Sequence, residues 1–169
     1  MIEVVNKVIE ELNEMCATSS AYGGLDGVIE ITTDAKFGDP GWVIYDEYPF
    51  FMVMPLGEVL ASESVGLAGR DVRNLSIQII LLVRASEYFD KNVTDSETDR
   101  LMVDVASRIR GWFTRMEKRR LEPVAGVRSV IIPTVSYMPQ ERGEVFAKSA
   151  VINMVVQKQY QHRSEEHTS

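Results

Sequence analysis

Hydrophobic residues recur every three or four positions at the start of the chain, which predicts an amphipathic helix over residues 2–16. Five apolar residues mark its packed side: Ile2, Val5, Ile9, Leu12 and Cys16. Glutamates occupy the opposite side, at Glu3, Glu10 and Glu14. We therefore expect this helix to pack on a core and to present an acidic face outward.

The hydrophobic pattern weakens between residues 17 and 47, where glycines and the sequence Gly-Asp-Pro-Gly at 38–41 indicate turns. We interpret this stretch as a long, loop-rich insertion that contains short strands over residues 28–32 and 42–45. Long loops in compact domains are usually either functional or disordered, and the sequence leaves both alternatives open.

Two strands are predicted in the middle of the chain, over residues 50–60 and 75–84. In the second, every odd position from 75 to 83 is aliphatic, which is typical of a sheet with one packed face. Pro55 removes a backbone donor from the first strand, which indicates an edge position or a bulge. The connection 61–74 is polar and too long for a tight turn, so we expect an extended hairpin arm.

A second helix is predicted over residues 95–119, because Thr94 and Glu97 form a capping box before a helical stripe. The stripe consists of Met102, Val105, Ile109, Trp112 and Met116. Beside it, three basic residues project from nearly the same side: Arg108, Arg115 and Arg119. This row can meet carboxylates, and the alternative is a favourable interaction with the helix dipole.

The remaining chain predicts a strand over residues 127–138 bent at Pro133, a turn over 140–144 and a last strand over 146–160. On the last strand six residues share one face: Phe146, Ala150, Ile152, Met154, Val156 and Tyr160. The element order α-β-β-α-β-β predicts one α+β domain over residues 1–162. In it an antiparallel sheet of about four strands packs on two helices.

Residues 163–169, with the sequence RSEEHTS, match the in-frame translation of a common sequencing-adapter oligonucleotide. We expect them to form a disordered, non-native tail, and the alternative is an ordinary polar C-terminal tail. Neither alternative gives the segment a function.

The composition excludes several classes of protein. The net charge of −7 and a pI near 4.9 argue against a general nucleic-acid binder, whose affinity comes from basic groups. No apolar run approaches the roughly 20 residues that span a bilayer, and the first ten residues carry charge where a signal peptide is apolar. A lone cysteine fits a reducing compartment, so we expect synthesis in the cytosol.

Catalytic chemistry is poorly represented in the sequence. The two histidines, His162 and His167, both lie near the C-terminus, so no Ser-His-Asp or Cys-His pair is expected in the core. Cys16 closes an apolar stripe and is interpreted as a buried structural thiol. We therefore predict no catalytic residue, no cofactor and no metal site. An enzyme that uses paired carboxylates alone is the remaining catalytic alternative.

Opposite charges on the two helices suggest assembly with other subunits. We hypothesise that the basic row Arg108, Arg115 and Arg119 contacts the acidic face formed by Glu3, Glu10 and Glu14 of a neighbouring copy. Such head-to-tail contacts between unlike surfaces can close as a ring. Aromatic residues near the first strand are interpreted either as core or as interface anchors: Trp42, Tyr45, Tyr48, Phe50 and Phe51.

The layout resembles the tail-terminator, or tail-completion, proteins of long-tailed bacteriophages. The likeness covers about residues 2–160. It rests on the N-terminal helix, the proline-flanked strand YPFFMVMP at 48–55, the long arm, the strand 75–84, the helix 95–119 and two closing strands. The resemblance implies a virion protein of the tail or neck, assembled in the host cytoplasm.

The resemblance implies that the subunit forms a six-membered ring on the tail tube, halts tube growth and presents a surface for head–tail joining. Its implied partners are copies of itself, the tail-tube protein and the head–tail connector, with DNA only passing through the lumen. We place lumen or docking positions on the arm at Glu58, Glu63, Arg70 and Asp71. The alternatives are a connector, neck or tail-tube subunit and, in a different class, a small ligand-binding α+β domain.

Overall fold

The computed structural model describes the backbone of residues 1–38, 48–64, 70–84, 95–115, 121–142 and 145–161. Side chains at 62–64, 70, 95–96, 139–142, 145–146 and 161 are not part of the description. The elements, in chain order, are α1 (Ile2–Ala17), η1 (Ser20–Tyr22), β1 (Lys36–Phe37), β2 (Phe50–Ser64), β3 (Arg70–Arg84), α3 (Asp95–Thr114), β4 (Val127–Arg142) and β5 (Val145–Gln161).

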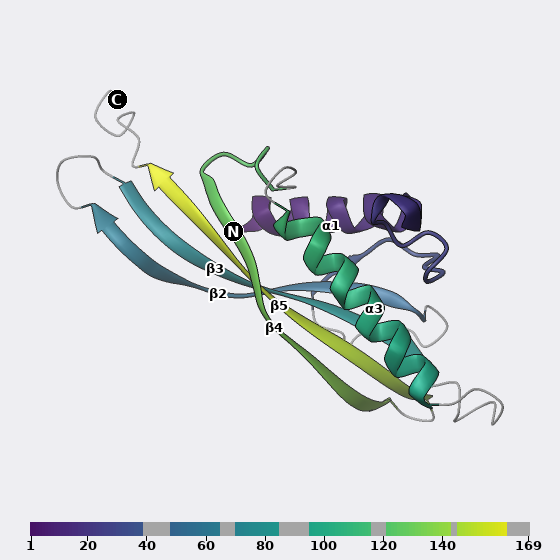
Figure 1. The fold of residues 1–169 in the computed structure, drawn as a ribbon. Coiled ribbons are helices and arrows are strands. Elements are labelled where there is room, and N and C mark those ends of the chain that lie inside the picture. Colours follow the sequence, from purple (N-terminus) through teal and green to yellow (C-terminus); the bar gives the residue numbers. More distant parts are fainter. Residues whose placement is uncertain (39–47, 65–69, 85–94, 116–120, 143–144, 162–169) are drawn as a thin grey trace.

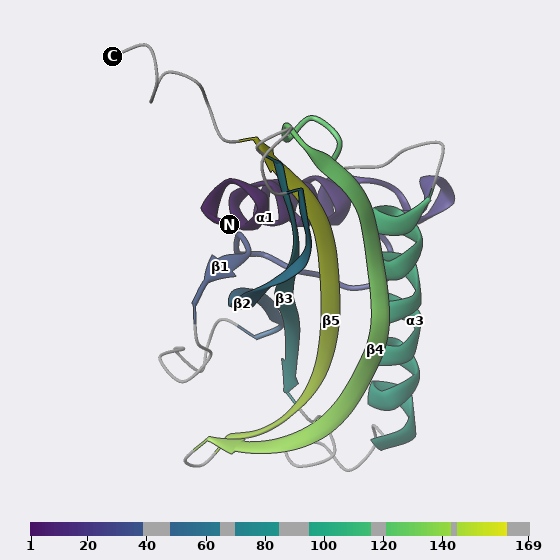
Figure 2. The same cartoon turned by 90° about the vertical axis from the view of Figure 1, so that its left-hand side faces the viewer.

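The described strands form one mixed sheet of five strands in the order β1-β2-β3-β5-β4, and α1 and α3 share a core with one of its faces (Figure 1). The predicted α+β class with two helices is confirmed. The predicted sheet of about four antiparallel strands lacked β1, which pairs parallel to β2 through Lys36 and Met52. Figure 2 shows how strongly β4 and β5 curve beside α3.

The core lies between the helices and one face of the sheet. From α1 it takes Val4, Val5, Val8, Leu12 and Met15, all fully buried. The predicted stripe is therefore rotated slightly, because Ile2 is 56% exposed and Ile9 and Cys16 are only partly buried. From β3 and β5 the core takes alternate residues, as the sequence predicted, including Ile79 and Ile152, which are direct cross-strand partners.

The opposite face of the sheet carries a second, smaller cluster of buried residues: Phe50, Met52, Ile80, Leu82 and Val151. The Tyr48 ring packs edge-on against Phe50, with 5.1 Å between the ring centroids. Phe51 is fully buried in the main core. These two phenylalanines therefore belong to the packed interior, whereas Trp42 and Tyr45 lie outside the described residues.

The insertion differs from its prediction. Residues 28–32 form no strand, because the amides of Val28 and Ile29 both donate to the Leu25 carbonyl, at 2.9 and 3.2 Å, and close a turn. Their apolar side chains instead pack partly buried against the core. The predicted strand over 42–45 lies outside the described residues.

The hairpin arm is longer and more ordered than the predicted polar connection. β2 and β3 stay paired as far as Ser64 and Arg70, and β3 also pairs with β5 as far as Arg70 and Gln161. We use "the arm" for residues 56–64, 70–74 and 157–161, which extend past the helices (Figure 1). The arm is thus three strands wide. Helix α1 contacts only its base, through Lys158 and Tyr160, so the outer part of the arm has no one-sided hydrophobic pattern in the sequence.

Both prolines predicted to distort a strand do so. The β2–β3 register shifts between Pro55 and Gly57, and the β4–β5 register shifts between Ile131 and Thr134, on either side of Pro133. The predicted turn over 140–144 is wrong in extent, since β4 continues to Arg142, which pairs with Val145. α3 ends at Thr114, before the predicted residue 119, and residues 116–120 lie outside the described part of the chain.

Candidate assembly surface

A cluster of charges lies where the arm leaves the helix layer. The Arg73 guanidinium on β3 donates to Asp71 Oδ2 at 3.2 Å and to Glu58 Oε2 at 3.4 Å. The hydrogen bond to Asp71 raises the pKa of Arg73, and the charge of Glu58 adds to that effect. Arg73 therefore holds together two of the carboxylates that the sequence placed on the arm.

Tyr160 on β5 forms the floor of this cluster. Its ring centroid lies 4.7 Å from the Arg73 guanidinium carbon and 4.7 Å from Lys158 Nζ, so two cations contact the phenol ring. Burial raises the pKa of Tyr160, and the nearby charge of Glu58 raises it further. The phenol is therefore neutral at physiological pH and accepts a hydrogen bond from the Met1 amino group at 3.2 Å.

Helix α1 is tied to the arm through the same cluster. Lys158 Nζ lies 3.5 Å from Glu3 Oε2, and the Lys158 side chain is almost completely buried between α1 and the sheet. The Met1 amino group lies 3.9 Å from Glu58 Oε1. These contacts fix the direction in which the arm leaves the body, which is the property that a docking element needs.

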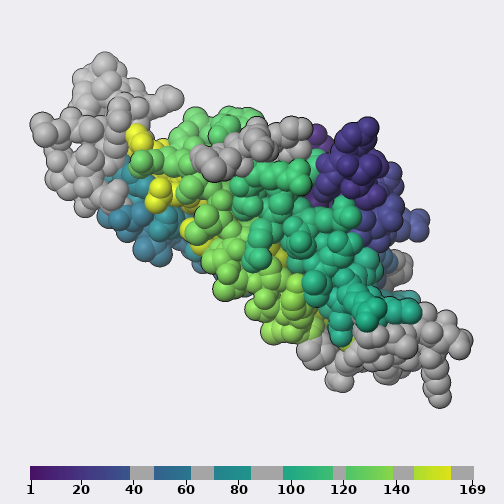
Figure 3. Space-filling model, viewed as in Figure 1, coloured from purple at the N-terminus to yellow at the C-terminus, as the bar shows by residue number. Residues whose placement is uncertain are grey.

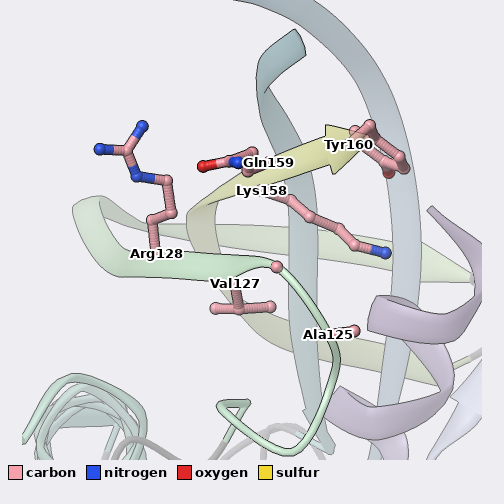
Figure 4. Close-up of a pocket in the computed structure, with 7 residues that line it drawn as sticks. Ala125, Val127, Arg128, Lys158, Gln159 and Tyr160 are labelled. Carbon is pink, nitrogen blue, oxygen red and sulfur yellow. The ribbon is translucent and has the colours of Figure 1, made fainter. Parts of the chain in front are cut away.

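A cavity of about 490 Å³ opens beside the cluster, lined by residues of β4, β5 and the segment before β4. Figure 4 shows that Arg128 and Gln159 project away from Lys158 and Tyr160 instead of converging on a common point. A ligand site needs polar groups that converge. This cavity therefore gives little support to the alternative of a small ligand-binding domain.

The outer strand of the arm presents apolar side chains to solvent. Leu56, Val59 and Leu60 on β2 are 51%, 63% and 51% exposed. Within the described residues, β1 covers the outer edge of β2 only at Met52 and Val53. Beyond that point no described strand pairs with this edge, which also carries exposed apolar side chains, a combination that attracts another strand.

The four predicted arm residues all lie on the arm. Glu58 and Asp71 meet at Arg73, as described above. Glu63 and Arg70 occupy paired backbone positions near the tip, opposite Asp71 and Ser64 respectively, and their side chains are outside the description. Arg73, Lys158 and Tyr160 were not predicted as residues of this site. The alternation Asp-x-Arg at 71–73 and Lys-x-Tyr at 158–160 was the available signal, since both pairs share one strand face.

The residues predicted for helix-to-helix contact are dispersed. Glu3 binds Lys158, Glu10 binds Lys7 at 3.1 Å, and Glu14 is exposed on α1. Arg108 binds Asp104 at 3.2 Å and also donates to the Ser20 carbonyl at 3.1 Å, so much of its donor capacity is used within the chain.

Arg115 is exposed at the rim of a second cavity of about 350 Å³, next to Tyr22 and Trp112. Arg119 lies outside the described residues. Among the residues of the two sets that the structure describes, the acidic face and the basic row form no common site within the chain.

Catalytic features remain sparse in the part of the chain that the structure describes. Burial raises the pKa of the Cys16 thiol to about 11, which makes it a poor nucleophile at neutral pH. Across the described ranges, no group of three or more histidine, cysteine, aspartate or glutamate side chains is placed to hold a metal ion.

None of the described helices combines the length and the apolar character that crossing a bilayer requires.

No protein-family model matches the chain, and no curated protein matches it at a significant level.

Proposed function

We propose that this chain is a structural subunit of a phage virion that forms a ring.

 Its resemblance to tail terminators suggests the form: a six-membered ring that caps the tail tube, stops its polymerisation and provides the surface for head–tail joining. One observation carries the proposal. The arm combines an open strand edge with exposed Leu56, Val59 and Leu60, and the Arg73 cluster fixes its direction.

The arm suits assembly better than catalysis for a physical reason. Apolar side chains that are more than half exposed destabilise nothing in the free subunit, but they contribute free energy once a partner removes them from water. A rigid arm loses little conformational entropy on docking, since its three strands are already ordered.

The acidic character of the chain agrees with a ring through which DNA passes. With a net charge of −7, the subunit repels phosphate groups on average, so a lumen built from it lets DNA slide instead of binding it. DNA is then cargo, and the binding partners are proteins: other copies, the tail-tube protein and the head–tail connector.

The proposal is tested by tube capping. Where the genome that carries this gene also encodes a tail-tube protein, that protein is polymerised with and without the subunit, and tube lengths are measured by electron microscopy. We expect short, capped tubes with the wild-type subunit and long tubes with Val59→Lys.

The matched control is Val103→Lys, because Val103 is an exposed apolar residue on α3, away from the arm. Tubes that grow equally long with and without the wild-type subunit would rule out a terminator. Incorporation of the subunit along the whole tube would favour the tail-tube alternative, and binding to the connector alone would favour a neck protein.

A further inference from the structure

The sheet has a second outer strand that is open like the arm. β4 ends the strand order on the side opposite β2, and no described strand pairs with its outer edge. Three apolar residues of β4 are exposed: Ile131 by 52%, Tyr137 by 43% and Met138 by 46%. Figure 3 shows β4 at the molecular surface beside α3.

The two open edges have matching directions. Each neighbouring pair among β2, β3, β5 and β4 is antiparallel, so β4 runs opposite to β2. If a second copy is added to the side of the sheet in the same orientation, its β4 meets β2 as an antiparallel neighbour. Away from Pro55, Pro133 and the register shifts beside them, the backbone groups of such a pair can form regular hydrogen bonds.

One exposed apolar residue of β4, Ile131, lies at the level of the arm edge of β2, whereas Tyr137 and Met138 lie level with Phe51 and Phe50. The cross-strand registers define two rows: Ile131, Val155, Ser76 and Gly57; and Ser129, Gln157, Asn74 and Val59. Ile131 is therefore level with Gly57, between Leu56 and Val59. A lateral neighbour would cover these apolar groups against one another.

The charges of the two edges favour pairing of β2 with β4 over pairing of two β2 edges. Residues 54–64 of β2 contain two glutamates and no basic residue, whereas β4 contains two arginines and one glutamate. Arg128 is exposed and lies between Val127 and Ser129 of β4. These two residues are level with Leu60 and Val59 of β2, so Arg128 lies close to the level of Glu58. Pairing two β2 edges would instead bring acidic strands together.

We propose that the arm edge of β2 in one copy pairs with the β4 edge of the next copy, so that one continuous sheet runs around the ring. This inference rests on the proposed ring-forming function and names the surface that builds the ring. The contact is heterologous, since each copy gives β2 to one neighbour and β4 to the other, and such contacts form a ring when the rotation from copy to copy completes a full turn. Each edge can pair over only a limited length, because Pro55 and Pro133 and the bulges beside them interrupt the strands. This limit restrains open-ended aggregation.

Disulfide trapping tests this contact. Closing a ring staggers the strands by a small amount, so we choose Val59 and Ile131, which are two residues apart in level. In a Cys16→Ala background, Val59→Cys and Ile131→Cys chains are mixed, both as concentrated protein and on capped tubes, and then oxidised. We expect the mixed dimer to be the main cross-linked product, and a chain with both cysteines to give a ladder that ends in a closed ring.

The control mixture pairs Ile131→Cys with Val103→Cys, since Val103 is similarly exposed on α3. It should give only background cross-linking. Dominant Val59→Cys homodimers, or a mixed dimer no more abundant than this control, would overturn the proposed pairing. All three positions are exposed, so the cysteine variants should fold, which circular dichroism verifies.

Capping separates the two proposals. If wild-type protein caps tubes but the mixed dimer is absent, the ring is built by another surface and the proposed function stands. If wild-type protein neither caps tubes nor forms rings, the proposed function fails, whatever the cross-linking shows. We also expect Ile131→Lys to abolish ring formation as Val59→Lys does, while Val103→Lys preserves it.

Discussion

The guanidinium of Arg73 lies 4.7 Å from the centre of the Tyr160 ring, across the seam between β3 and β5. The same guanidinium binds Asp71 and Glu58, so one cation links three strands at the base of the arm. Removing it should loosen the arm without disturbing the core, because Ile79 and Ile152 pair well inside the body.

We predict that Arg73→Met lowers the free energy of unfolding by about 1 kcal/mol, a modest value because the side chain is partly exposed and screened by solvent. Arg73→Lys keeps the charge but loses the forked geometry, and should fall between this variant and wild type. Urea denaturation measures both effects. The exposed Arg100 on α3 provides the control, and Arg100→Met should leave stability nearly unchanged. An equal loss in both methionine variants would contradict the role of the cluster.

Gly126 should not tolerate a side chain. Its φ of +84° lies in the left-handed region, and an added Cβ would lie 2.3 Å from the Gln159 carbonyl oxygen. Gly23 has nearly the same φ, +85°, but open space around it. We predict a loss of about 1 kcal/mol for Gly23→Ala, from backbone strain alone. Gly126→Ala should cost clearly more, because the β5 backbone must also shift. Thermal or urea unfolding compares the two, and equal losses would show that the close contact is unimportant.

The Cys16 thiol should resist alkylation in the folded protein. Burial raises its pKa to about 11, so at pH 8 very little thiolate is present. We predict that iodoacetamide reacts roughly a hundredfold more slowly with the native chain than with the urea-unfolded chain. Comparable rates would show that the thiol is more accessible than its surroundings indicate.

The same shift predicts how stability changes with pH. The native thiol keeps its proton where the unfolded thiol has lost it, so the contribution of Cys16 is intact below pH 9 and is lost as the pH rises towards 11. The stability of Cys16→Ala should therefore fall less steeply than that of wild type across this interval. Parallel curves for the two proteins would refute the assignment.

Lys148 joins β5 to α3 at the end of the sheet away from the arm. Its Nζ lies 3.0 Å from Asp99 Oδ1, and its side chain is nearly buried whereas Asp99 is half exposed. We predict that Asp99→Ala lowers the free energy of unfolding by about 1 kcal/mol, because a mostly buried ammonium loses a carboxylate partner. Glu14→Ala, at an exposed carboxylate on α1, should change stability by less than about 0.5 kcal/mol. Urea denaturation checks both.

The sequence predicted the elements that pack on one side. α1, α3 and β3 each bury one face, so their apolar residues repeat with the period of the element, as in the odd positions from Leu75 to Val83. The arm lacks such a repeat, because Val59 and Leu60 point to opposite faces and both are exposed. Its strands are defined by backbone pairing, which leaves no hydrophobic pattern in the sequence.

Only part of the charged cluster could be predicted from the sequence, for a similar reason. Glu58 and Asp71 stood out as acidic residues near a predicted arm. Tyr160, whose ring contacts their partner Arg73, is distant in sequence and comes close only through the β3–β5 register. β1 was missed because two residues, Lys36 and Phe37, are too short to show alternation. Its parallel pairing depends on the path of the preceding loop, which periodicity does not encode.

The placement of β3 beside β5 also sets the order in which the protein can fold. β2 with β3, and β4 with β5, are sequence neighbours, so each hairpin can form by local search. The two hairpins join only when the chain between them, which contains α3, brings β3 and β5 together, and this closure has the larger entropic cost. We therefore expect the seam between Ile79 and Ile152 to form late, and its closure to limit the rate of folding.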